Sequence, residues 1–164
     1  MAVEKEYGFR FVFLLLAVAV TGFIWQQSTV PAPQSAEISD TVRDVVVDAV
    51  GGETTAVGSF VDRFVRKIAH FVEFSLLGAC VEAYFLGHYA LRALAPRYAI
   101  GAFVAATDET IQIFTGRGAS VPDVLLDFSG FLAASLLLMA AERFFVLIKK
   151  RKVGGTVSAE RNDV

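Results

Sequence analysis

The sequence of 164 residues is poor in the residue types that build metal cages or covalent frameworks, with one cysteine, two histidines, one tryptophan and four prolines. The single cysteine, Cys80, excludes an intramolecular disulfide and any zinc site made of several thiolates. Because Cys80 lies within an apolar run, we expect a buried and inert thiol. The net charge of −2 provides no general basic field, so nucleic acid is not expected as a partner.

Apolar residues make up 55% of the chain and gather into four long runs separated by short charged stretches. A helix needs about 20 mostly apolar residues to cross a bilayer. No strand-like alternation extends for any length, which predicts an all-helical fold. We therefore predict a polytopic membrane protein whose four transmembrane helices lie at roughly residues 8–26, 64–88, 97–114 and 122–147. The first run is interpreted as a retained helix, with a cleaved signal peptide as the alternative.

The segments outside these runs have compositions of their own. Residues 39–52 (SDTVRDVVVDAVGG) predict a short amphipathic helix in the first outside loop, because their valines fall on one face. Residues 153–164 are rich in small and polar residues, which favours a disordered cytoplasmic tail. Residues 1–152 are then expected to form a single membrane domain.

The distribution of cations predicts the orientation of the chain in the membrane. Positive residues gather on the cytoplasmic side of membrane proteins. Cations stand at three helix ends that should share one side, and the cluster KKRK at 149–152 is the strongest of them; the others are Lys5 and Arg10, and Arg92 and Arg97. Both termini are therefore expected in the cytoplasm.

Two polar stretches interrupt the apolar runs near the opposite, outer side. In RKIAHFVEF (66–74), Arg66, His70 and Glu73 share one helix face, and Arg63 and Lys67 flank it. The second stretch, DETIQIFTGRGASVPD (108–123), ends one helix with a polar face, turns at two glycines and starts the next helix near Pro122. Three helices should thus bring polar residues to one level in the outer leaflet; from the second stretch and the helix after it these are Asp108, Glu109, Gln112, Arg117, Asp123 and Asp127.

These stretches resemble the two signatures of the VanZ-like membrane proteins, R-K-x-x-H-F-x-E-[YF] and D-E-x-x-Q-x-F…G-R…D-[VL]-x-x-[ND]-x-x-G. The resemblance covers roughly residues 8–148, and Asp127 stands where asparagine is common in that family. It implies four helices, the bacterial cytoplasmic membrane and a cell-envelope context. One member of the family is linked to resistance to the glycopeptide teicoplanin, but the resemblance implies no reaction.

Four interpretations of the polar site remain open. The first is binding of an anionic envelope lipid or lipid-linked glycan, because arginine holds phosphate in a bidentate fork; its ligand-binding candidates are Arg63, Arg66, Lys67, Gln112, Arg117, Asp123 and Asp127. The second is acid–base catalysis, for which the candidates are His70, Glu73, Asp108 and Glu109. The third is a Mg²⁺ or Ca²⁺ site, which no fixed spacing supports; its oxygen ligands would come from Asp108, Glu109, Gln112, Asp123 and Asp127. The fourth is a structural network, with pairs such as Arg66–Asp123 and His70–Glu109.

The favoured function is binding of an envelope lipid or glycolipid headgroup, with its modification left open. Membrane lipids are then the partners, and no cofactor or metal is predicted. The alternative is a non-catalytic structural or assembly subunit of a larger membrane complex, whose buried charges serve helix packing.

Overall fold

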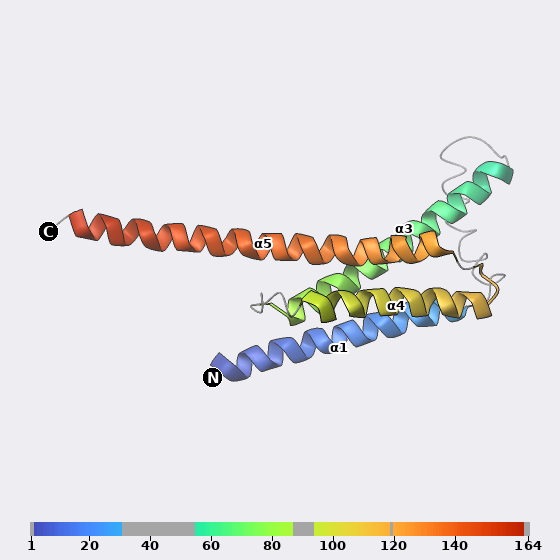
Figure 1. The fold of residues 1–164 in the computed structure, drawn as a ribbon, viewed down its shortest axis with the longest axis horizontal. Coiled ribbons are helices and arrows are strands. Elements are labelled where there is room, and N and C mark those ends of the chain that lie inside the picture. The colour runs from blue at the N-terminus through green and yellow to red at the C-terminus, as the bar shows by residue number, and fades with distance from the viewer. Residues whose placement is uncertain (1, 31–54, 87–93, 119, 163–164) are drawn as a thin grey trace.

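A computed structural model describes residues 2–30, 55–86, 94–118 and 120–162, with side chains for 7–30, 63–86, 94–118 and 120–150. The elements are α1 (Ala2–Thr29), α3 (Thr55–Tyr84), α4 (Leu94–Phe114) and α5 (Val121–Asn162) (Figure 1). Over these ranges the chain has no strand, which confirms the expected all-helical fold. The amphipathic helix predicted at 39–52 lies outside the described residues.

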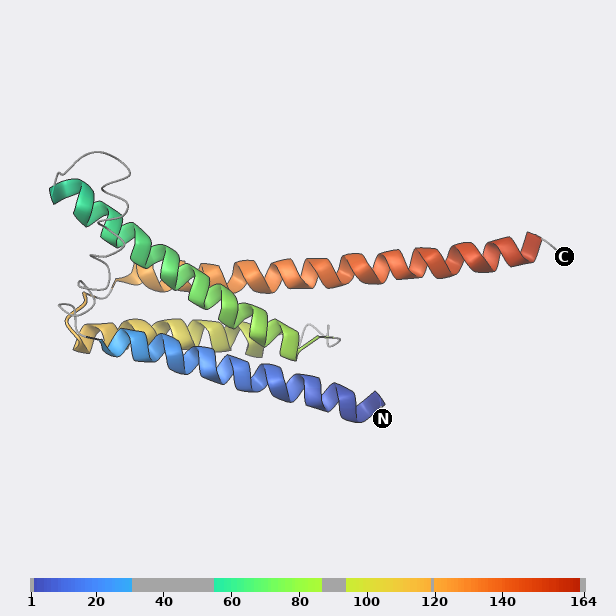
Figure 2. The ribbon, with the colours of Figure 1, turned by 180° about the vertical axis from the view of Figure 1, so that it is seen from behind.

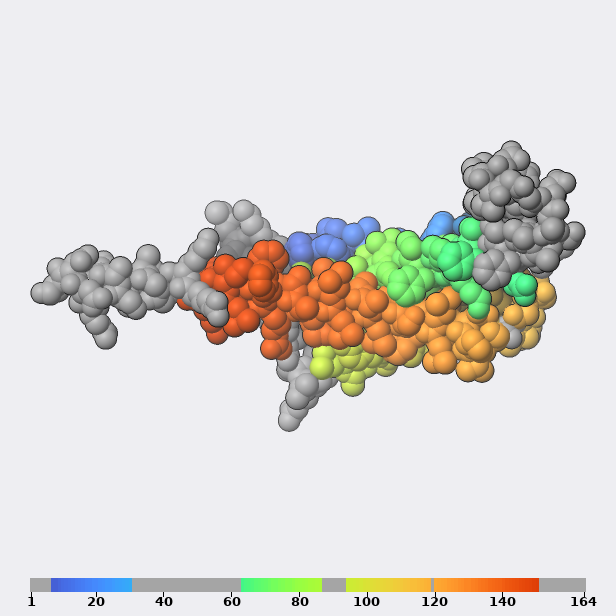
Figure 3. Space-filling model, turned by 90° about the horizontal axis from the view of Figure 1, so that it is seen from above, coloured from blue at the N-terminus to red at the C-terminus, as the bar shows by residue number. Residues whose placement is uncertain are grey.

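The four helices run alternately in opposite directions, so that every second helix end meets at the same end of the bundle. α1 and α4 lie side by side, while α3 crosses α5 obliquely (Figures 1 and 2). α3 and α4 each contact both α1 and α5, and the contact of α3 with α5 is the most extensive. Figure 3 shows this contact from another side, with the orange surface of α5 lying along the green surface of α3.

The core of the bundle is apolar and is centred on Phe131 of α5. Phe74 and Leu77 of α3, Val104 of α4 and Ile24 of α1 are buried with it. These residues recur at helical spacing, so each helix contributes one apolar face to the centre. The core separates two ends of the bundle, each of which contains polar residues.

Glycines allow α3 and α5 to approach each other closely. A Cβ atom on Gly78 would collide with the backbone of Phe131, and one on Gly130 would collide with the backbone of Phe71. Ser75 strengthens the same contact, because its hydroxyl donates a hydrogen bond to the Gly130 carbonyl oxygen, 3.1 Å away. The absence of side chains at Gly78 and Gly130 therefore permits the close approach of the two helices.

Two of the described helices are long and apolar enough to cross a membrane, over Tyr7–Thr29 of α1 and Val121–Lys150 of α5. Large apolar side chains cover their outer surfaces and those of the other helices, including Phe23, Phe103 and Leu137. Exposed apolar surface of this extent is typical of contact with lipid or with another protein. α3 and α4 carry more charge in their interiors, and their crossing of the membrane remains part of the expected topology.

The last helix of the chain is the longest of the described elements. α5 is helical through Asn162, and the disordered cytoplasmic tail expected at residues 153–164 stays a prediction. No proline follows Pro122, and the lysines and arginines at 149–152 have high helix propensity, whereas Gly154 and Gly155 have low propensity and weaken the helix without ending it.

Candidate functional site

A tight turn between α4 and α5 places polar groups from both helices at one end of the bundle. Gly116 and Gly118 adopt positive φ angles of 71° and 76°, which side chains with a Cβ atom rarely tolerate. Ser120 stands immediately before α5, and its hydroxyl donates to the Asp123 carboxylate at 2.6 Å, while its backbone N–H donates to Glu109. The cap of α5 is therefore tied to α4 beside the turn that contains Arg117.

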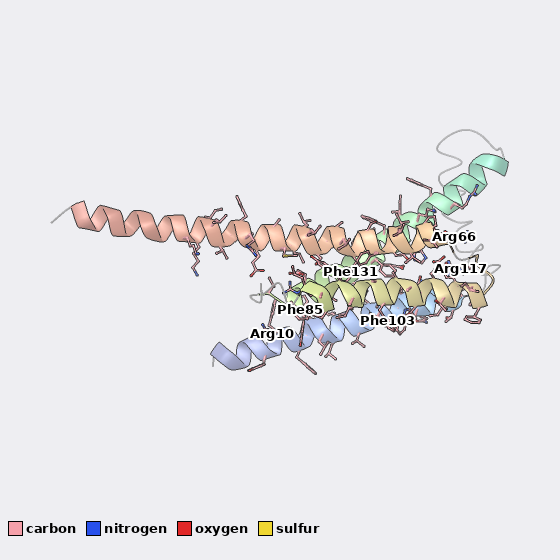
Figure 4. All side chains as sticks on the ribbon, viewed as in Figure 1. Arg10, Arg66, Phe85, Phe103, Arg117 and Phe131 are labelled. Carbon is pink, nitrogen blue, oxygen red and sulfur yellow. The ribbon has the colours of Figure 1, made fainter. Side chains whose placement is uncertain are left out.

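This end of the bundle contains a cavity of about 240 Å³. Figure 4 shows Arg66 of α3 and Arg117 of the turn together at this end, whereas Arg10 and Phe85 lie at the other end. The residues that line the cavity come from α3, α4, the turn and α5; they are Arg63, Arg66, Lys67, His70, Glu109, Gln112, Arg117, Gly118, Asp123, Leu126 and Asp127. The convergence of three helices expected from the sequence is thus observed.

The floor of the cavity contains His70 and Asp127, and Asp108 lies beneath them. His70 Nδ1 lies 3.7 Å from Asp108 Oδ2 and 3.7 Å from Asp127 Oδ1. Asp108 is 0% exposed and Asp127 is 2% exposed, so both carboxyl groups lie away from solvent. Asp108 is held by Ser28 Oγ, which donates to Oδ1 at 2.6 Å, and by Gln112 Nε2, which donates to Oδ2 at 2.8 Å.

The rim of the cavity carries the positive charge. Lys67 Nζ lies 2.8 Å from Asp123 Oδ1, and Arg117 Nη1 donates to the Gln27 carbonyl oxygen at 2.7 Å. Burial lowers the pKa of the Arg117 guanidinium from its ordinary value, and the charge of Arg66 acts in the same direction. An arginine nevertheless stays protonated at neutral pH, so the rim holds two cations that repel each other.

Nine of the eleven predicted site residues line this cavity. Asp108 contacts the floor from below through His70 and Gln112. Glu73 does not line the cavity and lies about one helical turn further along α3, half-buried.

The ion pairs differ from the pairs that a structural network suggested. The structural network predicted an Arg66–Asp123 pair, but Asp123 forms its ion pair with Lys67. It also predicted a His70–Glu109 pair, but His70 lies next to Asp108 and Asp127. Asp123 stands in the first turn of α5, level with Lys67, whereas Asp127 lies one turn deeper, level with His70.

Sequence reasoning missed the contribution of α1. Ser28 fixes the Asp108 carboxylate, and the Ser28 carbonyl oxygen accepts a hydrogen bond from Thr115 Oγ1 at 3.1 Å. The polar sequence QQST that ends α1 was the available signal, because alternating helix directions bring this end beside the end of α4.

A second polar cluster lies in the interior toward the opposite end of the bundle. Arg97 Nη1 lies 2.6 Å from Glu82 Oε1, and Ser135 Oγ donates to Glu82 Oε2 at 2.9 Å. The Arg97 guanidinium also lies over the Phe85 ring, 4.7 Å from its centroid. Arg97, Glu82 and Ser135 are fully buried. Arg97 was counted among the cations at a helix end, and the structure shows its side chain buried, because it pairs with Glu82 inside the bundle.

The cavity therefore combines exposed and half-buried cations at its rim with an imidazole and a buried carboxylate at its floor. Such a rim suits a phosphate or carboxylate anion, which guanidinium groups hold through paired hydrogen bonds. The floor offers one nitrogen and several oxygen atoms, which suit a cation or the transfer of a proton.

Comparison with known proteins identifies the family. No curated protein and no solved structure matches the chain significantly. The VanZ/LLP1 family profile matches residues 11–145, a range that contains every residue of the cavity. This match confirms the similarity to the VanZ-like membrane proteins that the two polar stretches indicated, and the apolar helices agree with it. The chain is a membrane protein that belongs to the VanZ/LLP1 family.

Proposed function

We propose that the protein binds the anionic headgroup of an envelope lipid or lipid-linked glycan in the cavity at the end of α3, α4 and α5. The observation that carries this proposal is the convergence of Arg66, Lys67 and Arg117 on one cavity in a membrane protein. Arg66 and Arg117 come from different elements and repel each other, so a bound anion relieves that repulsion.

The size of the cavity supports a headgroup as the ligand. Pockets for whole drug-sized ligands measure about 300–1,000 Å³, whereas this cavity measures about 240 Å³. A phosphate with part of its attached sugar or glycerol needs less room than a whole ligand, because the acyl chains stay in the bilayer. Gln112 and Asp123 at the cavity wall offer hydrogen-bonding groups for hydroxyls of such a headgroup.

The proposed topology places this cavity at the outer leaflet of the bacterial cytoplasmic membrane. All four helices cross the membrane in this proposal, within a single domain over residues 1–152. α4 has 21 residues and is about 31 Å long at 1.5 Å per residue, which matches the hydrocarbon core. The cations at 149–152 lie in the part of α5 that is remote from the cavity, and positive residues gather on the cytoplasmic side. Because the four helices alternate in direction, both termini then lie in the cytoplasm in this proposal.

Modification of the headgroup would fall to the acidic and imidazole groups beneath the rim. His70, Asp108 and Glu109 lie close enough to the cavity to exchange protons with a ligand, whereas Glu73 stands further away. Incubation of the protein with the identified lipid, followed by mass analysis of the headgroup, tests for such a modification. The proposal itself concerns binding.

A role as an assembly subunit is the second candidate, and the exposed apolar surface favours it. Phe103, Leu137 and many other large side chains point away from the bundle. Lipid covers such surfaces equally well, so this role predicts a different mutational pattern. Substitutions such as Leu137→Asn would abolish function in an assembly subunit, and Arg66→Gln would leave it unchanged.

Native mass spectrometry of the purified full-length protein tests headgroup binding. We expect a co-purifying anionic lipid on the wild type, and its selective loss in Arg66→Gln and Arg117→Gln. Lys150→Gln is the matched control, because it removes an exposed cation at the far part of α5. Equal lipid retention in Arg66→Gln, Arg117→Gln and Lys150→Gln, with helicity intact by circular dichroism, would contradict the proposal.

A further inference from the structure

Three side chains from three different helices bring ligand atoms together at the floor of the cavity and directly beneath it. His70 comes from α3, Asp108 from α4 and Asp127 from α5. One nitrogen or oxygen atom of each lies within 4.8 Å of the others. Because the three residues lie far apart in the sequence, only the packing of the bundle creates this cluster.

The distances within the cluster suit a shared ion better than direct hydrogen bonds. His70 Nδ1 lies 3.7 Å from an oxygen of each aspartate, whereas a hydrogen bond of this kind spans about 2.7–3.2 Å. Ligand atoms bonded to one ion at about 2.1 Å lie roughly 3.0–3.5 Å apart at octahedral or tetrahedral angles. The two distances from His70 therefore need to shorten by only a few tenths of an ångström to suit a shared ion, and all three ligand atoms already lie within 4.8 Å of one another.

The burial of Asp127 is the second and independent observation. The side chain is 2% exposed, and its Oδ2 atom has no hydrogen-bond partner among the described residues. His70 Nδ1 is likewise without a hydrogen-bond partner there. An ionised carboxylate removed from water is costly unless a cation or hydrogen bonds compensate it. A divalent cation would satisfy Asp127, Asp108 and the free imidazole nitrogen at once.

The surroundings of Asp108 also resemble those of a ligand to a metal. Ser28 and Gln112 each donate a hydrogen bond to its carboxylate, which fixes the orientation of the group. Carboxylates that ligate metals are commonly held by such outer hydrogen bonds.

We propose that His70, Asp108 and Asp127 form a binding site for a divalent transition-metal ion such as Mn²⁺ or Zn²⁺. The imidazole nitrogen favours these ions over Mg²⁺ and Ca²⁺, which prefer sites made only of oxygen. His70 and Asp127 line the cavity, so the remaining coordination positions of the ion would be open to water or to a ligand oxygen. The site differs from the oxygen-only Mg²⁺ or Ca²⁺ site considered from the sequence, because it includes His70. It goes beyond headgroup binding and does not depend on it.

Metal binding can be measured with the metal alone. The full-length protein, free of any affinity tag, is stripped with chelator in detergent, equilibrated with Mn²⁺ or Zn²⁺ and analysed by inductively coupled plasma mass spectrometry. We expect about one ion per chain in the wild type and at least a tenfold weaker affinity in Asp127→Asn and His70→Gln. Asp123→Asn is the matched control, because it removes a carboxylate from the same cavity wall without touching the floor.

A spectroscopic readout separates coordination from adventitious binding. Co²⁺ substituted into the site should show d–d absorption bands that shift in His70→Gln and persist in Asp123→Asn. The proposal is overturned if the wild type binds no ion, or if Asp127→Asn and His70→Gln, each folded by circular dichroism, bind as tightly as the wild type. Lipid loss in Arg66→Gln with metal retained supports both proposals. Lipid retention in Arg66→Gln contradicts headgroup binding alone, and undiminished metal binding in Asp127→Asn and His70→Gln contradicts the metal site alone.

Discussion

The two polar clusters of the bundle are built from similar residues but are completed in different ways. The inner cluster consists of Glu82, Arg97 and Ser135. Both carboxylate oxygens of Glu82 accept hydrogen bonds there, one from Arg97 and one from Ser135. The outer cluster consists of the polar residues around the cavity. Two of its oxygen atoms, Asp127 Oδ2 and Glu109 Oε2, are buried without a hydrogen-bond partner among the described residues. The inner cluster is enclosed in the core, whereas the outer one borders a cavity of about 240 Å³. The inner cluster is thus suited to hold helices together, and the outer one to receive a ligand.

The largest loss of stability is expected when the ion pair of the inner cluster is broken. Glu82→Ala leaves Arg97 buried without its carboxylate, which we expect to cost about 3–5 kcal/mol of unfolding free energy. Thermal and denaturant unfolding in detergent measure this change. A double variant, Glu82→Met with Arg97→Met, should recover much of the stability, because it removes both charges. Wild-type stability of Glu82→Ala would show that the inner cluster is not structural.

The next largest loss of stability is expected from a substitution at the contact of α3 with α5. Gly130→Ala places a methyl group against the Phe71 backbone, so the two helices must separate, at a cost of about 1–3 kcal/mol. Separation also moves Asp127 of α5 away from His70 of α3, and metal affinity should fall with stability. Gly22→Ala is the control, since nothing lies within 4 Å of its added Cβ atom. Equal unfolding midpoints for Gly130→Ala and Gly22→Ala would contradict the close contact.

At the outer cluster the expected effect on stability has the opposite sign. Asp127→Asn replaces a buried carboxyl group, whose Oδ2 lacks a hydrogen-bond partner among the described residues, with a neutral amide, so we expect the metal-free protein to gain about 1 kcal/mol of stability. The same substitution should abolish metal binding. Chemical unfolding in the presence of chelator checks the gain. A loss of stability comparable to that of Glu82→Ala would place Asp127 in a structural network instead.

The smallest effect on stability is expected at the rim. Lys67→Gln removes an ion pair whose side chains are 51% and 33% exposed, and such pairs contribute about 0–1 kcal/mol. Lipid retention should nevertheless fall, since Lys67 supplies part of the positive charge of the cavity. Unfolding curves and native mass spectrometry on the same preparation separate the two effects. Unchanged lipid retention would exclude Lys67 from the ligand site.

Much of the outer site was predictable because its residues repeat at helical spacing and carry charge inside apolar runs. His70 and Asp127 were placed at one level by helix geometry alone, and both line the cavity. Exact pairings were not predictable, because a difference of one residue decides whether Arg66 or Lys67 faces Asp123. Ser28 was missed because it lies at the end of an otherwise apolar helix.

The inner cluster was not predictable for a different reason. Glu82 and Arg97 each stand near the end of an apolar run, where solvent exposure is the ordinary expectation. Their pairing depends on how α3 and α4 pack, and Ser135 reaches Glu82 from α5. The sequence pattern of a single helix contains no information on such a contact between three helices.

Thermal unfolding with added phosphatidylglycerol tests the central claim most directly. A ligand that binds only the folded state stabilises it by about 2.7 kcal/mol at a concentration 100 times its dissociation constant. We predict that the unfolding temperature of the wild type rises saturably with this anionic lipid, more than with phosphatidylcholine. The rise should be lost in Arg66→Gln and kept in Lys150→Gln. An equal rise in all three proteins, or none in the wild type with any anionic envelope lipid, would contradict headgroup binding at the outer cavity.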